Sequence, residues 1–245
     1  MMARYLPLLV VLVAWEVAAR CRVIDAAFVS SPSEVLRSMA LWYGSGRILP
    51  QLAATLGEIA VGASLSFLVG VALGLLIGWY RPVSDTASPV LFFLDAVPVV
   101  AIAPMAVLVI GIGPWIAVLL VFLLTVLPIT FSVAAGVRTV PAALLRMGIH
   151  FGASDRQLFR TIVLPAIAPY IFGALRGNIG RALAGALVGE WLGSHRGLGS
   201  MMFDAAGVFE VRSVYVGALS VVIISLLASA AITAAEHRLC RWRPA

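Results

Sequence analysis

Lysine is missing from this 245-residue sequence, and all seventeen basic residues are arginine. The absence excludes two kinds of chemistry. A phosphate-binding loop of the Walker type needs a lysine that reaches the nucleotide phosphates, and a Ser-x-x-Lys nucleophile needs one as well. We therefore assign no catalytic residues and no cofactor to the chain, and we do not expect it to hydrolyse ATP alone.

Cysteine and histidine are also scarce. Cys21 and Cys240 lie at opposite ends of the sequence, which indicates neither a disulfide framework nor a metal site. His150, His195 and His237 are scattered, and none has a zinc-binding spacing such as His-Glu-x-x-His. We predict no metal site. The formal net charge of +6 comes without an aromatic and basic platform, so we predict no nucleic-acid partner either.

Charged residues make up only 11% of the sequence, whereas hydrophobic residues make up 62%. A soluble domain has about 25% charged residues. The mean hydropathy is +1.07. About 20 apolar residues cross the hydrocarbon core as a helix, which satisfies its own backbone there. The sequence thus predicts an all-α membrane protein with one domain over residues 1–245, surrounded by lipid. We place six spans at about 5–19, 58–80, 88–110, 115–137, 162–188 and 214–235.

The first span imitates a signal peptide in length and composition. Glu16 inside it and Arg20 directly before Cys21 favour an uncleaved span instead. The placement of arginine favours a topology in which both termini and the segment 138–160 are cytoplasmic. Arginines at 238, 241 and 243 in the tail are the clearest inside signal.

The segment between the first two spans contains a helix start. Ser31 suits the N-cap, Pro32 the first helical position and Glu34 the third. Apolar residues then fall on one face. We predict a short amphipathic external helix at 32–43, which ends at the Gly44-Ser45-Gly46 turn.

Glycine and proline mark two of the spans. Gly70, Gly74 and Gly78 follow one another at four-residue spacing, which lets two helices approach closely. The partner helix is expected within the same subunit, although a dimer contact stays possible in principle. Pro98 and Pro104 interrupt the third span, as is tolerated beside neighbouring helices or a cavity.

The loop at 138–163 has the pattern of two helices joined by a turn. Gly152 is a natural stop for the first helix. Ser154 and Gln157 have the spacing of a capping box that opens the second helix. By itself this pattern fits a generic amphipathic loop as well as a docking element.

The spacing from Gly152 over nine residues to Ile162-Val163-Leu164-Pro165 resembles the cytoplasmic EAA loop of ATP-binding-cassette (ABC) importer permeases. Three further stretches are similar to the sulfonate, taurine and nitrate branch of that family. These stretches are Phe28-Val29-Ser30-Ser31-Pro32, Pro98 with Ala101 and Pro104 ahead of Gly111-Ile112-Gly113, and Gly189-Glu190-Trp191 followed by Gly197-Leu198-Gly199.

The resemblance implies a six-span bundle like that of type I ABC importer permeases, with a cytoplasmic coupling helix. It implies a homodimer in a bacterial inner membrane, two separate ATPase subunits docked at the loop, and a periplasmic or lipid-anchored binding protein that delivers a small anionic solute. The loop residues to which this role is carried over are Arg146, Gly152, Ala153, Ser154, Asp155, Gln157, Leu158, Phe159, Ile162, Leu164 and Pro165.

Three positions depart from the family pattern. Arg146-Met147-Gly148 stands where Glu-Ala-Ala is usual, which reverses a charge. Glu58 and Asp95 stand where basic residues are common. These changes concern the ATPase interface and the class of solute.

Charged residues within or beside the spans are candidates for the pathway, because charges at this depth usually face protein or a water-filled cavity. Arg176 and Arg181 would suit an anionic solute. The alternative is an internal pair, such as Arg176 with Asp95, or an arginine whose side chain extends to the membrane interface. Glu190 is either a residue of the external gate or a solvated loop residue. The candidate pathway residues are Asp95, Pro98, Arg176, Arg181 and Glu190.

A secondary transporter or a channel subunit without an ATPase partner is the competing class. Such proteins more often show internal repeats with matching broken helices, and the six spans contain no convincing pair. A membrane enzyme would need a clustered catalytic set, which the sequence does not show.

The first prediction concerns ATP. The purified chain should hydrolyse none, because it has no lysine to contact the phosphates. Phosphate release from the isolated polypeptide in detergent measures this. Robust hydrolysis that persists after removal of every copurifying protein would place the chain in another class.

Overall fold

The computed structural model describes residues 6–21 and 29–240, and all of their regular secondary structure is helical. Tyr5, Phe28, Arg241 and Arg243 lie outside these residues, so the predictions that involve them are not addressed. The helices are α1 (Leu6–Arg20), α2 (Pro32–Gly44), α3 (Leu49–Trp79), α4 (Arg81–Ala96), α5 (Val99–Ile110), α6 (Trp115–Arg138), α7 (Ala142–His150), α8 (Asp155–Leu158), the π-helix η2 (Phe159–Val163), α9 (Leu164–Gly177), α10 (Ile179–Gly193), α11 (Leu198–Gly207) and α12 (Val211–Leu239).

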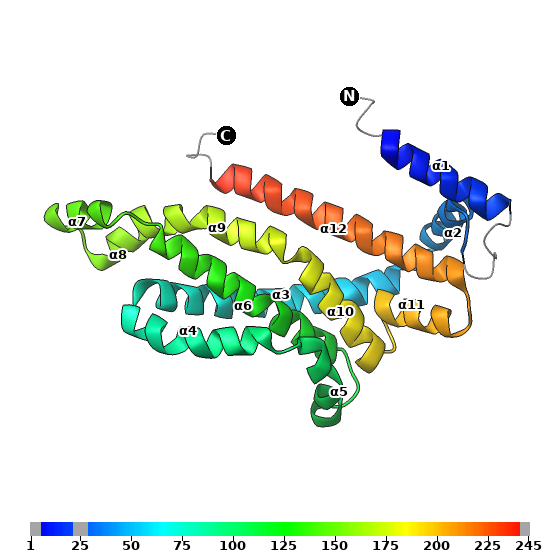
Figure 1. The fold of residues 1–245 in the computed structure, drawn as a ribbon, viewed down its shortest axis with the longest axis horizontal. Coiled ribbons are helices and arrows are strands. Elements are labelled where there is room, and N and C mark those ends of the chain that lie inside the picture. Colours follow the sequence, from blue (N-terminus) through cyan, green and yellow to red (C-terminus); the bar gives the residue numbers. More distant parts are fainter. Residues whose placement is uncertain (1–5, 22–28, 241–245) are drawn as a thin grey trace.

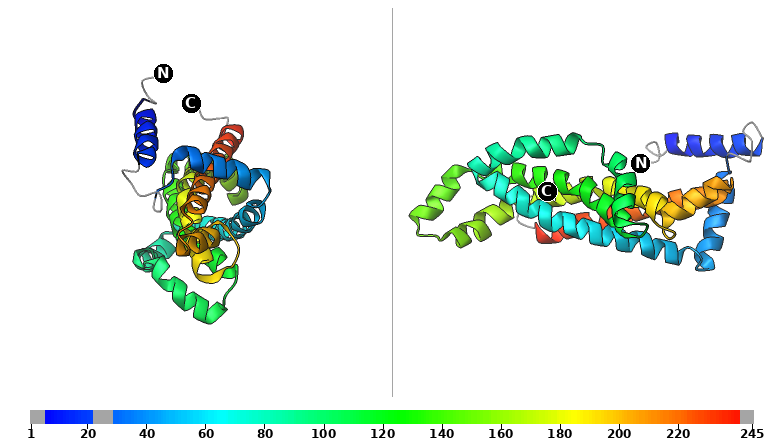
Figure 2. Two further views of the ribbon diagram at one scale, coloured as in Figure 1. Left: turned by 90° about the vertical axis from the view of Figure 1, so that its right-hand side faces the viewer. Right: turned by 90° about the horizontal axis from the view of Figure 1, so that it is seen from below.

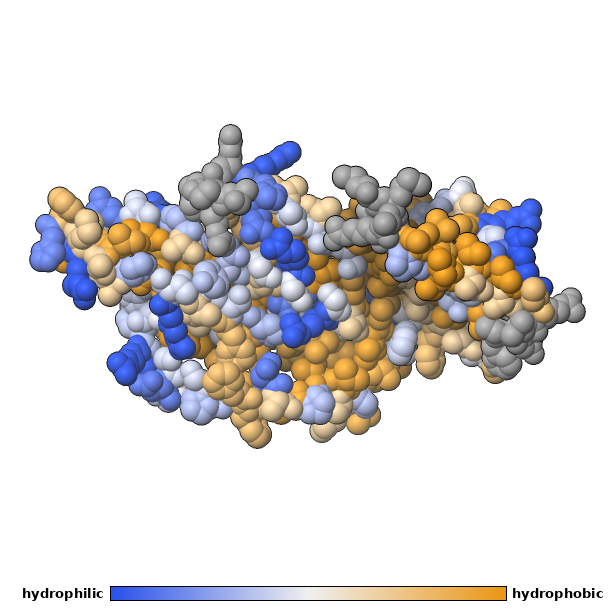
Figure 3. Space-filling view, turned by 45° about the horizontal axis from the view of Figure 1, so that its top comes forward, coloured by the Kyte–Doolittle hydropathy of each residue, from blue (hydrophilic) through white to orange (hydrophobic). Residues whose placement is uncertain are grey.

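The molecule is elongated, and its long helices run roughly along one axis (Figure 1). Helices α7 and α8 form one end, and α2 and α11 lie at the other. Helix α1 stands beside the bundle rather than inside it (Figure 2). Hydrophobic residues cover much of the middle of the face in Figure 3, with hydrophilic residues among them, and further hydrophilic residues lie at both ends of the long axis. This distribution is that of a bundle whose middle lies in lipid.

Four helical stretches of the described chain are long and apolar enough to cross a membrane, and a fifth is possible if the bent pair α4 and α5 forms one span. The four are Leu49–Trp79, Trp115–Arg138, Asp155–Gly193 and Val211–Leu239. Helix α1 has 15 residues, or about 22 Å at 1.5 Å per residue, which is less than the roughly 30 Å of hydrocarbon. The prediction of six spans is therefore met only in part.

The third predicted span, at 88–110, is broken at Pro98, one of the two prolines expected to interrupt it. Helices α4 and α5 meet at an angle of 86°. Pro98 lacks an N–H to continue the helix and disfavours helical backbone at the residue before it. Val97 is accordingly extended, with φ −75° and ψ 125°. The break leaves the end of α4 and the start of α5 beside α3 and α6.

Helix α3 begins at Leu49, well before the predicted start at residue 58. The prediction assumed that a charged residue marks the end of a span. Glu58 is instead buried, with 6% of its surface exposed, so its charge does not end the helix.

The glycines of α3 pack against α6 within the same chain, as predicted. A Cβ atom built on Gly70, Gly74 or Gly78 would lie only 2.9, 2.7 or 2.6 Å from the nearest atom of α6. Real Cβ atoms almost never come so close. The two helices therefore touch backbone to side chain along several turns.

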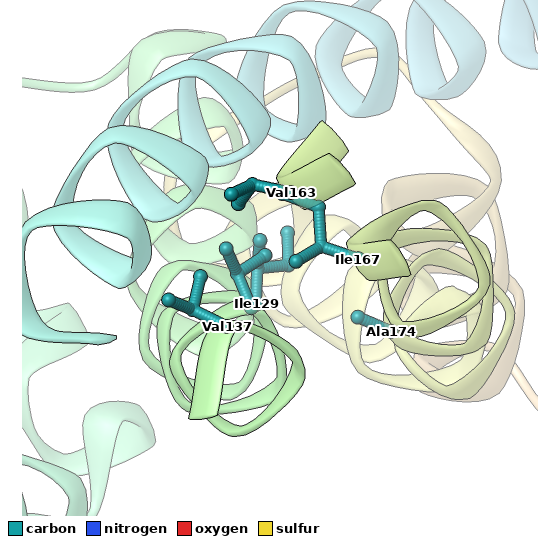
Figure 4. Packing of buried hydrophobic residues seen from close by; sticks show 6 residues of the cluster. Ile129, Val137, Val163, Ile167 and Ala174 are labelled. Atoms are coloured by element: carbon teal, nitrogen blue, oxygen red, sulfur yellow. The ribbon is translucent and has the colours of Figure 1, made fainter. Parts of the chain in front are cut away.

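Helix α6 also supports α10 and α9. Gly185, Gly189 and Gly193 of α10 each approach α6 too closely for a side chain. On another side of α6, a cluster of aliphatic residues joins it to η2 and α9 (Figure 4). Its members are Ile129, Val133, Val137, Val163, Ile167 and Ala174. Thus α6 is the centre of the bundle.

The second prediction tests this contact. Gly74→Ala should lower the thermal stability of the purified protein, because its Cβ would lie 2.7 Å from the carbonyl oxygen of Thr130 and from the Cβ of Val133. Overpacking of this kind costs about 1–3 kcal/mol. The measurement is the midpoint of thermal unfolding in detergent.

Gly57→Ala in the same helix is the matched control. A Cβ atom at Gly57 meets no other atom within 4 Å, so alanine should be neutral or favourable there, by up to about 1 kcal/mol of helix propensity. Equal midpoints for both variants would show that the contact between α3 and α6 is not as close as described.

Candidate functional site

Helix α7 ends in a left-handed turn at Gly152. The φ of Gly152 is +78°, a conformation that glycine adopts without steric cost. The N–H of Ala153 donates to the carbonyl of Gly148 (2.9 Å), and the N–H of Gly152 donates to the carbonyl of Ile149 (2.9 Å). These two bonds make a Schellman motif, which satisfies the carbonyl groups at the end of α7. The geometry of Gly152 is the one its position predicts.

Helix α8 begins with the predicted capping box. The N–H of Gln157 donates to Ser154 Oγ (3.4 Å), and the N–H of Ser154 donates to Gln157 Oε1 (2.8 Å). Asp155 lies in the first turn, where a carboxylate favours the positive end of the helix dipole. The turn between α7 and α8 is therefore fixed at both of its ends.

Gly148 explains part of the unusual Arg146-Met147-Gly148 sequence. A Cβ atom at this position would overlap Cδ2 of Leu158. Glycine thus lets α7 lie directly on α8, and the Leu158 side chain is buried with 4% exposed. Phe159 packs against the cluster on α6. The expected contact of Leu158 with an ATPase groove is therefore not available in this structure.

The loop exposes apolar side chains other than Leu158 and Phe159, and the sequence analysis did not identify them. Leu144, Met147, Ile149 and Phe151 are 46%, 55%, 61% and 85% exposed. The spacing of Leu144, Met147 and Phe151 follows one face of a helix and could have revealed them. Four basic residues belong to the same part of the sequence: Arg146, His150, Arg156 and Arg160.

The segment after α8 is a π-helix, η2. The N–H of Leu164 donates to the carbonyl of Phe159, five residues before it. Pro165 has no N–H to donate, and Leu164 and Pro165 begin α9. A continuous run of helix therefore leads from α8 to the membrane-spanning part, and Ile162 lies within η2.

Three of the five candidate pathway residues line one cavity. It has a volume of about 670 Å³ and lies at the break between α4 and α5, against α3 and α6. Asp95 and Pro98 come from the break, and Arg181 comes from α10. The Arg181 guanidinium donates to Asn178 Oδ1 (3.1 Å).

Arg176 does not line this cavity and instead forms an ion pair. Its Nη1 atom lies 3.1 Å from Glu236 Oε2 and 3.3 Å from Thr233 Oγ1, both on α12. Arg176 forms an internal ion pair, as the alternative interpretation expected, but its partner is Glu236 rather than Asp95. This ion pair joins α9 to α12.

Glu190 is fully buried, with 0% exposed, so a solvated loop residue is excluded. The Thr55 hydroxyl donates to Glu190 Oε1 (2.5 Å), and the N–H of Gly199 donates to Glu190 Oε2. The N–H of Leu198 in turn donates to Thr55 Oγ1 (2.9 Å). Glu190 thereby fastens the Gly197-Leu198-Gly199 turn to α3 and α10.

Glu58 lies next to Glu190, close enough for the two carboxyl groups to interact electrostatically. Within the described residues its Oε2 atom has no hydrogen-bond partner. Glu58 also contributes to a cavity of about 600 Å³, which Trp115, His195 and Arg196 line as well. No group of three or more metal-binding side chains occurs among residues 6–21 and 29–240.

Comparison with known proteins agrees with this architecture. Residues 70–241 match the family described as "Binding-protein-dependent transport system inner membrane component". The chain belongs to this family of ABC importer permeases. It is thus a multi-pass inner-membrane protein and the transport subunit of an importer, not an enzyme, and it binds no cofactor of its own.

Curated relatives span almost the whole permease. The formylaminopyrimidine transport permease of Halalkalibacterium halodurans is 32% identical over 96% of this chain and 93% of its own length. A probable ABC transporter permease of Haemophilus influenzae is 33% identical, over 95% of both chains. The taurine transport permease of Escherichia coli is 29% identical, over 96% of this chain and 87% of its own.

Among solved structures, the inward-facing methionine ABC transporter MetNI contains a chain with the same fold. The TM-score is 0.62 at 19% sequence identity, and the match covers 79% of this permease and 94% of that chain. At this identity the likeness concerns the fold alone.

The third prediction concerns Glu190. Glu190→Ala should destabilise the permease by roughly 1–3 kcal/mol, because the Gly199 N–H and the Thr55 hydroxyl would lose their buried acceptor. Thermal unfolding of the detergent-solubilised protein is the measurement. The control is Glu210→Ala, since Glu210 is exposed and its side chain does not cap α12. Equal loss in both variants would contradict the anchoring role of Glu190.

Proposed function

We propose that two copies of this permease enclose the translocation pathway of an ABC importer, and that two separate ATPase subunits drive it by docking on α7 and α8. A binding protein outside the membrane delivers the solute. The end with α7 and α8 then faces the cytoplasm together with both termini, and α2 is external. The whole chain acts as a single transmembrane domain.

The observation that carries this proposal is the rigid, protruding loop at 138–163. Its Schellman motif and capping box fix the angle between α7 and α8. Met147, Ile149 and Phe151 project from it without cover. An apolar tip of this kind is typical of a protein interface. The nearly continuous helix from α8 to α10 gives a docked partner a mechanical connection to the spans.

The contact residues proposed here differ from those that the sequence favoured. Gly152, Ala153, Ser154, Asp155 and Gln157 shape the turn, whereas Leu158, Phe159, Ile162, Leu164 and Pro165 connect it to the bundle. Arg146 lies on the exposed side of α7. An ATPase that accepts this surface should present apolar residues with acidic groups around them.

The pathway is proposed to pass the cavity at the break between α4 and α5. Asp95, Pro98 and Arg181 line it, whereas Arg176 is paired with Glu236 and Glu190 is buried in the fold. Arg181 is therefore the residue to contact an anionic group of the solute. Relatives named for taurine and for aliphatic sulfonates are consistent with a solute that has such a group.

The fourth prediction tests the loop as the coupling element. Valine at Gly152 would have to adopt the left-handed backbone at φ +78°, which costs roughly 1–2 kcal/mol for an L-residue and more for a β-branched one. Gly152→Val should therefore rotate α8 and uncouple the ATPase. We expect normal abundance in the membrane, with loss of ATPase copurification or of solute-stimulated ATP hydrolysis.

Gly173→Val is the matched control, because Gly173 lies in α9 and a Cβ atom there meets no other atom within 4 Å. This variant should behave as the wild type. Transport and coupling that survive Gly152→Val would show that the loop is not the element that transmits the movement. A wild-type complex that transports without any ATPase would favour a secondary transporter or a channel.

A further inference from the structure

The cavity at the break between α4 and α5 contains two opposite charges in an otherwise apolar lining. Asp95 and Arg181 are its only ionisable lining residues among those described, and the others are aliphatic side chains, prolines and Phe122. Its wall includes residues 122–124 and 126–128, which lie in the middle of α6. The two charges thus face a cavity at the depth where the lipid core is expected, and charges are costly there unless they are paired or solvated.

The two charges do not pair with each other. No ion pair joins Asp95 to Arg181 in the described part of the chain, where the ion pairs are Arg20 with Glu16, Arg176 with Glu236, and Arg212 with Glu34. The partner of Arg181 is the neutral amide of Asn178. The Asp95 side chain has no hydrogen bond or ion pair with any other described residue.

We propose that this cavity binds a small zwitterion, whose cationic nitrogen contacts Asp95 and whose anionic group contacts Arg181. A solute with both groups supplies an opposite charge to Asp95 and to Arg181 at once. A purely anionic solute leaves the Asp95 carboxylate unpaired. The volume of about 670 Å³ is within the range of small-molecule sites. The inference rests on the proposed pathway, for which an anionic group of the solute was proposed, and it adds a cationic group on the same solute.

Asp95 is the specificity-determining residue in this arrangement. With a basic residue at this position the cavity would carry two positive charges and favour an anion. With Asp95 its formal charge is balanced. The selectivity between a zwitterion and the matching anion is therefore set by one carboxylate, which stands at the point where Pro98 breaks the helix.

The experiment compares matched probes on the assembled complex of permease and ATPase in lipid nanodiscs, without binding protein. Each probe pair shares the anionic group and differs in the amine: taurine with isethionate, β-alanine with propionate, and 2-aminoethylphosphonate with ethylphosphonate. Equilibrium binding of the labelled compounds gives one affinity ratio for each pair. We expect at least one ratio to favour the zwitterion by about tenfold or more, as one charged hydrogen bond allows.

Asp95→Asn should bring that ratio close to one, and Asp95→Glu should keep it. Arg181→Gln should weaken both members of the pair. Asp85→Asn is the control, because it removes the same charge from an exposed position outside the cavity, and it should change nothing. If Asp95→Asn does not reach the membrane, Asp95→Ser takes its place.

A wild-type complex that shows no preference for the zwitterion in any pair would overturn the proposal, and so would a preference that survives Asp95→Asn. Neither result would contradict the proposed assembly of the permease with an ATPase. Conversely, a permease that never copurifies with an ATPase contradicts the proposed function, while the binding ratios still decide the role of Asp95.

Discussion

Glycine at four-residue spacing brings α3 onto the surface of α6, and this contact places most of the other helices. Gly70, Gly74 and Gly78 leave no room for a side chain at the seam. Helix α10 reaches α6 through three glycines of its own, and α9 packs on the remaining side through Ile167 and Ala174. In lipid, close van der Waals contact takes over part of the role that the hydrophobic effect has in water, so small residues decide the arrangement.

The central position of α6 has consequences for both functional regions. At one end, the aliphatic cluster on α6 holds η2 and therefore the base of the α7–α8 loop. In the middle, the same helix forms a wall of the cavity with Asp95 and Arg181. A movement imposed on the loop thus reaches a helix that also borders the cavity. In the proposed mechanism, this shared helix connects the docking surface for the ATPase to the pathway.

Polar side chains of the bundle serve mainly to connect its helices and turns. Glu190 accepts hydrogen bonds from Thr55 and Gly199 and so anchors the turn before α11. Arg176 joins α9 to α12 through Glu236. Glu190 and Arg176 thus find their partners within the chain, whereas the buried Oε2 atom of Glu58 has no hydrogen-bond partner among the described residues. Asp95 and Arg181 differ because they face a cavity and do not pair with each other, which is why they are the better candidates for contact with a solute.

The class of protein and several local structures could be predicted from the order of the residues. Apolar runs with few charges predicted helices in a membrane, and the spacing around Gly152, Ser154 and Gln157 predicted the turn and the capping box, because such motifs depend only on neighbouring residues. The tertiary structure decided the rest. Which charges meet depends on contacts between helices far apart in the chain, so that Arg176 lies beside Glu236 and Glu190 beside Thr55. Pro98 predicted an interruption of its span, but the 86° angle there and the packing of Leu158 against Gly148 depend on three-dimensional contacts, which spacing along one segment does not encode.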